Sequence, residues 1–202
     1  MVKNFYMQPT PNLKKLIVFI DGGYLRRILE KFWEISLISD PRKFASAIST
    51  IADMVPNHDP IDFFYVHLDT IRIYYYDAIV STDDQKYPEF RKFFEDLKLN
   101  YTSQSPLELK FGRLIKGKDE KYRQKGVDVL LSTDLVVKAF QNHYDLAMII
   151  TGDDDFLDAV KIVKDFSGKQ IIGLYNPRET STRLIDCFDY KLPFLPEPLF
   201  KK

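Results

Sequence analysis

Aspartates gather at two points of this chain where an apolar run of strand length ends. Asp21 directly follows the run 16–20, and the triplet Asp153, Asp154 and Asp155 closely follows the run 146–150. Adjacent carboxylates repel one another, and burying their charge without compensation is costly. A cation would offset that cost, and carboxylate oxygens with no His or Cys nearby select a hard ion, Mg²⁺ or Mn²⁺. If the two strands are neighbours, the sequence predicts a divalent-metal site at their ends.

Two further acids lie at the start of a helix predicted over 127–142. Asp128 stands near its N-terminus, where free N–H groups and the helix dipole favour a carboxylate. Asp134 lies six residues on, about 240° around a regular helix. In a regular helix, the carboxylates of Asp128 and Asp134 therefore cannot both face one small site. Either Asp128 lies in the preceding loop, or one of the two is not a ligand. Taken alone, each of these aspartates is explained as a helix cap or a turn residue. Taken together, they favour a metal site.

Strands alternate with helices along nearly the whole chain, which predicts an α/β fold with a mostly parallel sheet. Ligands bind at the carboxyl ends of the strands in such sheets. The predicted strands are 16–20, 61–68, 71–80, 107–115, 145–151 and 169–175. The predicted helices begin near Tyr24, Asp40 and Pro88 and span 127–142 and 155–166. The segment 190–202 carries prolines interleaved with Leu and Phe and is expected to lie extended on an apolar surface.

The composition favours one compact domain, since 45% of the 202 residues are hydrophobic. A lone Cys187 cannot form an internal disulfide and excludes a zinc site of the usual cysteine type. No apolar run is long enough to span a bilayer, and no signal-peptide core follows the N-terminus. We therefore expect a cytoplasmic protein with no membrane partner.

Basic residues are concentrated in one segment, although the chain has equal numbers of basic and acidic residues, 29 of each. Between Lys110 and Lys125 there are seven basic and only two acidic residues. Such a segment can contact phosphates locally. On charge alone, a solvated loop is the more ordinary interpretation.

Four stretches of the chain resemble the NYN family, including its LabA-like bacterial proteins, within the PIN-like nuclease superfamily. They are Phe19–Gly23, Lys125–Val129 followed by Asp134, Ile150–Phe156, and the strand Arg72–Asp77. The resemblance implies a PIN-like three-layer sandwich with a mostly parallel central sheet flanked by helices. We expect this domain over 16–188, with an N-terminal extension at 1–15 and a Pro-rich C-terminal tail at 189–202.

The resemblance also implies a metal-dependent ribonuclease acting on single-stranded RNA, and a homodimer is compatible with it. Mapped onto this chain, the implied catalytic acids are Asp21, Asp128, Asp134, Asp153 and Asp155. All of these except Asp134 are expected to hold Mg²⁺ or Mn²⁺; Asp154 stands where the family often has Ser. The expected substrate contacts are Thr151, Lys116, Lys118, Lys121, Arg123 and Lys125, with Tyr122 available for stacking.

One departure from the family pattern motivates an alternative. The family usually has Asn three residues after the first Asp, where this chain has Tyr24. A phenol cannot replace an amide in orienting a carboxylate or a bound water, so a catalytically weak or inactive RNA-binding or regulatory protein is the second hypothesis. A Mg²⁺-dependent phosphatase of the haloacid-dehalogenase type is disfavoured, because it needs an acid at the position of Gly23.

Overall fold

The structure is a computed structural model that describes residues 12–33, 40–54 and 66–194. Its strands are β1 (Asn12–Asp21), β2 (Val66–Ile79), β3 (Leu107–Lys116), β4 (Tyr122–Lys125), β5 (Leu146–Ile150), β6 (Gln170–Tyr175) and β7 (Tyr190–Pro193). Its α-helices are α1 (Gly22–Trp33), α2 (Pro41–Met54), α3 (Tyr87–Asn100), α4 (Val127–Phe140), α5 (Leu157–Ile162) and α6 (Thr182–Cys187). A 3-10 turn, η3 (Asp154–Phe156), precedes α5, and a π-helical turn, η4 (Val163–Ser167), follows it.

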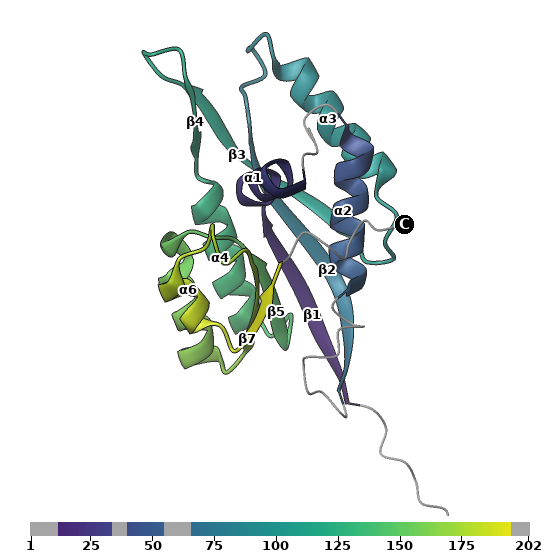
Figure 1. Cartoon of the computed structure of the whole chain (residues 1–202), viewed down its shortest axis with the longest axis vertical. Helices are drawn as coiled ribbons and strands as arrows, with labels where there is room; N and C mark the ends of the chain where they lie inside the picture. The colour runs from purple at the N-terminus through teal and green to yellow at the C-terminus, as the bar shows by residue number, and fades with distance from the viewer. Residues whose placement is uncertain (1–11, 34–39, 55–65, 195–202) are drawn as a thin grey trace, which may run out of the picture.

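The strands form one sheet in the order β4-β3-β2-β1-β5-β6-β7. Every pairing is parallel except that of β3 with β4. The sheet curls like a half-barrel with helices around it (Figure 1). The predicted α/β fold with a mostly parallel sheet is therefore confirmed.

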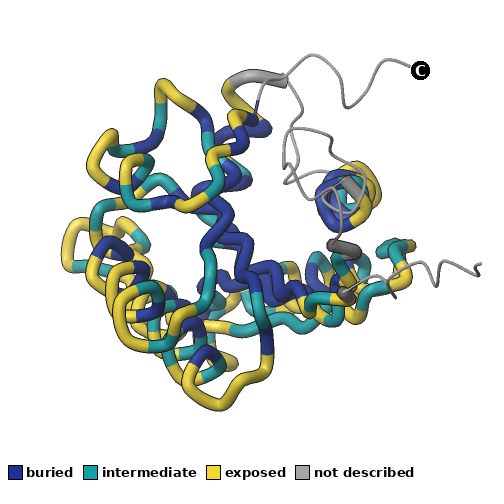
Figure 2. Tube along the Cα trace, turned by 90° about the horizontal axis from the view of Figure 1, so that it is seen from below, coloured by how far each residue is buried: buried dark blue, intermediate teal, exposed yellow. Residues whose placement is uncertain are grey.

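Helices cover both faces of the sheet because its central strands are apolar on both sides. In β1, Leu16, Val18 and Ile20 pack with residues of α1, α2 and α3. Ile17 and Phe19 point the other way and pack with residues of α4, α5 and α6. The same alternation holds in β2 and β5, as a strand with a two-residue side-chain period requires. The central strands are accordingly the most deeply buried part of the chain (Figure 2).

Local signals in the sequence fix several element boundaries. Asp40 caps α2, since its Oδ1 accepts hydrogen bonds from the backbone N–H groups of Arg42 and Lys43 at 3.1 and 3.3 Å. Gly168 ends the helix after β5 with a left-handed φ of 67°, as predicted. No helix among the described ranges is long and apolar enough to cross a membrane.

Two predictions of secondary structure were wrong in part. The strands expected at 61–68 and 71–80 are one strand from Val66 onward, and residues 61–65 lie outside the described residues. The register of β1 on β2 shifts by one residue at Ile71, so a bulge lies where the sequence suggested a break. The strand expected at 107–115 is β3, but part of the basic loop expected after it is a second strand, β4, which forms a hairpin with β3. The six-residue α6 was not predicted, and the start of the expected extended tail is β7, a strand of the sheet.

Candidate active site

Asp21 occupies the carboxyl end of β1, in the middle of the sheet. The neighbouring strand β5 runs parallel, with Ile20 opposite Ile150, so Thr151 lies beside Asp21. The Thr151 hydroxyl donates a hydrogen bond to Asp21 Oδ2 at 3.1 Å. The backbone N–H of Tyr24, in the first turn of α1, donates to Asp21 Oδ1, also at 3.1 Å. Both carboxylate oxygens are thus held in place by the strand ends and the helix start.

Four of the predicted aspartates influence one another electrostatically. Burial raises the pKa of Asp21; the Tyr24 and Thr151 hydrogen bonds oppose this, and the charges of Asp128 and Asp77 raise it further. Burial also raises the pKa of Asp128, and the charges of Asp153 and Asp155 add to that rise. Asp128, in the first turn of α4, thus acts on Asp21 and is acted on by Asp153 and Asp155; these four carboxylates are called the acidic edge below.

The connection from β4 to α4 places Asp128 in this group. Gly126 joins the two elements with a φ of 84°, a left-handed conformation that glycine adopts without strain. Helix α4 begins at the next residue, so Asp128 lies in its first turn, where the helix dipole favours a negative charge. Asp153 has a second task, since its Oδ1 accepts the backbone N–H of Asp155 at 3.1 Å and caps η3.

The donor set suits Mg²⁺ or Mn²⁺ in its chemistry, since it offers carboxylate oxygens whose mutual repulsion a cation would relieve. Within 12–33, 40–54 and 66–194, however, no group of three or more His, Cys, Asp or Glu side chains is arranged to hold an ion. Mg²⁺ commonly keeps several waters and binds through one or two carboxylates plus substrate phosphates. The acidic edge fits that kind of site better than a cage built from protein ligands alone.

The structure does not bring Asp134 to the acidic edge. Helix α4 is regular through Asp128 and Asp134, so the two carboxylates point in different directions. Asp134 Oδ2 accepts a hydrogen bond from the Tyr76 hydroxyl at 2.7 Å and lies 2.6 Å from Lys110 Nζ. Lys138 lies 3.8 Å from its other oxygen. Asp134 was predicted to be catalytic, but in the structure it links α4 to the sheet through an ion pair.

Thr151 was predicted to contact a substrate phosphate, and its position argues against that. The residue is fully buried, and its hydroxyl donates to Asp21. Thr151 therefore orients the first carboxylate of the site instead of reaching the substrate.

The Tyr24 side chain turns away from the carboxylates. Its ring is buried, and its hydroxyl lies 2.7 Å from Thr180 Oγ1 and accepts the backbone N–H of Asn176 at 2.8 Å. Tyr24 is hydrogen-bonded to Asp21 through its backbone N–H and not through its phenol. The phenol neither replaces an active-site amide nor blocks the site; it fixes the segment that follows β6.

Sequence reasoning missed a buried carboxylate beside Asp21. Asp77 on β2 is only 1% exposed. It accepts hydrogen bonds from the Tyr75 hydroxyl at 2.7 Å and from the guanidinium of Arg26 on α1 at 2.9 Å. The Gln124 amide nitrogen lies 3.4 Å from its Oδ1. The available signal was an acid inside the apolar run 73–80, which calls for a buried cation.

The basic residues of the β3–β4 hairpin divide into paired and unpaired groups. Lys116 pairs with Glu120, and Arg123 forms a two-pronged ion pair with Asp119. Among the described residues, no carboxylate pairs with Lys118, Lys121 or Lys125. The hairpin is anchored next to its turn by the Tyr122 hydroxyl, which donates to Asp84 at 2.7 Å. Its free lysines can therefore meet phosphates from a fixed support.

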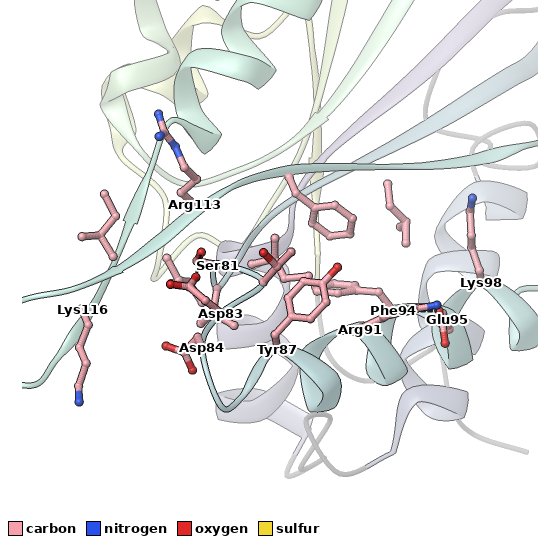
Figure 3. A pocket seen from close by; sticks show the side chains of 17 residues that line it. Ser81, Asp83, Asp84, Tyr87, Arg91, Phe94, Glu95, Lys98, Arg113 and Lys116 are labelled. Carbon is pink, nitrogen blue, oxygen red and sulfur yellow. Dashed lines mark hydrogen bonds and ion pairs between the residues drawn. The ribbon is translucent and has the colours of Figure 1, made fainter.

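One large groove lies away from the acidic edge. It is a groove of about 1100 Å³ between α3 and β3, bordered by Asp83, Asp84, Arg91 and Lys98 (Figure 3). None of the predicted catalytic aspartates lines it. This groove is therefore separate from the acidic edge.

Comparison with known proteins agrees with this architecture. The NYN domain family matches residues 15–195. No curated protein matches the chain. Among solved structures, a protein of unknown function, VPA0982 from Vibrio parahaemolyticus RIMD 2210633, is similar with a TM-score of 0.58 and 18% identity, over 93% of this chain and 96% of that chain. At that identity the likeness supports the fold alone.

Proposed function

This chain belongs to the NYN domain family, part of the PIN-like superfamily, and we propose that its acidic edge hydrolyses RNA phosphodiester bonds with the help of Mg²⁺ or Mn²⁺. NYN domains are generally nucleases, which gives the reaction class. The observation that carries the proposal is the placement of Asp21 at the carboxyl end of β1 beside β5, with Asp128 in the first turn of α4 close enough to act on it and to be acted on by Asp153 and Asp155. Repulsion of that kind is costly unless the site binds a cation.

The roles of the side chains follow from their positions. Asp21, Asp128 and Asp153 would hold the ion, and Thr151 keeps the Asp21 carboxylate facing the site through its hydrogen bond. When bound, the ion supplies polarisation of the phosphate and a water of lowered pKa. Asp155, exposed beside Asp128, is placed to accept a proton from the attacking water.

The substrate class is proposed from the hairpin next to the site. Lys118, Lys121 and Lys125 would neutralise phosphates of a single strand, an interaction that weakens with salt.

Cleavage of a labelled single-stranded RNA by the pure protein tests the proposal. We expect cleavage with Mn²⁺ or Mg²⁺, none with EDTA, and none in folded Asp21→Asn and Asp153→Asn variants. Asp165→Asn is the matched control, because Asp165 is an exposed carboxylate on η4 outside the acidic edge. Cleavage that survives EDTA, or that is equal in all variants, would refute the proposal.

A second candidate is an NYN protein that binds RNA without cleaving it. The observation in its favour is that no ready-made group of three metal-binding side chains occurs in the described part of the chain. It predicts RNA binding that is salt-sensitive, independent of divalent metal, and unaccompanied by cleavage at any metal concentration.

A further inference from the structure

Gln124 brings a side-chain amide from the basic hairpin to the acidic edge. It lies on β4 opposite Leu114 of β3, shortly before α4 begins. The residue is exposed, so solvent and substrate can reach it. Its amide nitrogen lies 3.4 Å from Oδ1 of the buried Asp77.

A small space separates this amide from Asp21. A Cβ atom placed on Gly23 would lie 3.4 Å from Asp21 Oδ1, 3.4 Å from Gln124 Oε1 and 3.6 Å from Gln124 Nε2, so both the oxygen and the nitrogen of the amide face this space. Both groups therefore border the same space, and Gly23 keeps it open because it has no side chain there. Any larger residue at this position would put a methyl group between the carboxylate and the amide.

Asp77 sets the orientation of the amide. A carboxylate only accepts hydrogen bonds, so the amide nitrogen must face Asp77. Arg26 and Tyr75 hold Asp77 from the other side, which fixes its position. One N–H of Gln124 is then used by Asp77, and the second N–H remains for a ligand in the space beside Asp21.

We propose that Gln124 is a substrate-binding residue of this site, whose free amide N–H donates to a non-bridging oxygen of the phosphate bound beside Asp21. This inference rests on the proposed function. A neutral donor suits the place, because the guanidinium of Arg26, on the other side of Asp77, is already engaged by that carboxylate. The next residue along the strand, Lys125, is one of the unpaired lysines of the hairpin, so the same short element carries a second group that can bind a phosphate.

Cleavage kinetics of Gln124→Met and Gln124→Glu test the assignment. Met keeps the length of the side chain but cannot donate, and removing a donor to a reacting oxyanion typically costs about 100-fold in rate. Glu keeps the length and adds a negative charge next to Asp21, so the acidic limb of the pH–rate profile should move to higher pH. Gln141→Ala, at the far end of α4, is the control and should cleave like the wild type.

Binding of the same RNA in EDTA, followed by fluorescence anisotropy, separates this inference from the proposed function. If the wild type binds but never cleaves, the proposed function fails, and a several-fold weaker affinity of Gln124→Met would still support the phosphate contact. If folded Gln124→Met binds and cleaves like the wild type, the contact does not exist. A loss of activity explained by a lowered melting temperature, with the pH profile of Gln124→Glu unshifted, would also overturn the assignment.

Discussion

Replacing Tyr24 by Phe removes one hydroxyl that ties α1 to the segment after β6. The hydroxyl accepts the backbone N–H of Asn176 at 2.8 Å and lies 2.7 Å from Thr180 Oγ1. Asn176 and Thr180 are both buried, so water cannot readily take the place of the phenol. The ring itself would remain in the core, which restricts the change to these two contacts.

The cost follows from what the variant leaves unpaired. A buried donor or acceptor that loses its partner costs about 1–3 kcal/mol. The Thr180 hydroxyl can rotate toward another acceptor, whereas the Asn176 N–H cannot, so we expect the free energy of unfolding to fall by about 2–3 kcal/mol. In a domain of this size, that lowers the melting temperature by roughly 5–10 °C.

Thermal and urea unfolding of Tyr24→Phe measure this effect, with Tyr87→Phe as the control. Among the described residues, no hydrogen bond to the Tyr87 hydroxyl is present, and its loss should change little. RNA cleavage by Tyr24→Phe should stay close to that of the wild type at temperatures where both are folded. Unchanged stability, or a large loss of cleavage in a folded variant, would refute the conclusion that this side chain is structural.

The remaining predictions concern the two acids of α4. Asp128→Asn should raise the free energy of unfolding at neutral pH without metal, because the raised pKa of Asp128 means that its charged form is disfavoured in the folded state. This gain should vanish in melts below the ordinary aspartate pKa, where Asp128 is protonated in both states, and an equal effect at all pH values would contradict it. Asp134→Asn should lower the free energy of unfolding by about 1–3 kcal/mol, because Tyr76 and Lys110 lose a charged partner. Mn²⁺ binding, measured by calorimetry, should stay unchanged in this variant. A loss of Mn²⁺ binding would instead mean that Asp134 is a metal ligand.

Short-range patterns in the sequence were sufficient for the frame of the fold. The runs 16–20 and 146–150 are apolar at every position, which only a strand buried on both faces requires, and they became the neighbours β1 and β5. Helix geometry left two alternatives for Asp128 and Asp134, and the regular helix α4, with Asp134 paired to Lys110, agrees with the one in which Asp134 is not a ligand. Element α6 and strand β7 were missed because four to six residues are too few to show a period.

Contacts between distant positions explain what the sequence did not reveal. Asp77 is bound by Arg26, 51 residues earlier, and by Gln124, 47 residues later, and no local pattern links these positions. The direction of Tyr24 was equally hidden, because its partners Asn176 and Thr180 lie at the other end of the chain. Thr151 was assigned to the substrate because its burial against Asp21 depends on the register between β1 and β5.

Calorimetric titration of Mn²⁺ into the apo protein tests the central claim, that the acidic edge is a divalent-metal site, most directly. We predict saturable binding to the wild type and to Asp165→Asn, and binding weakened at least tenfold in Asp21→Asn and Asp153→Asn. Binding should also release more protons as the pH falls, because the raised pKa values of Asp21 and Asp128 favour their protonated forms and a ligating carboxylate must lose its proton. No binding at millimolar Mn²⁺, or equal binding in all four proteins, would contradict the account.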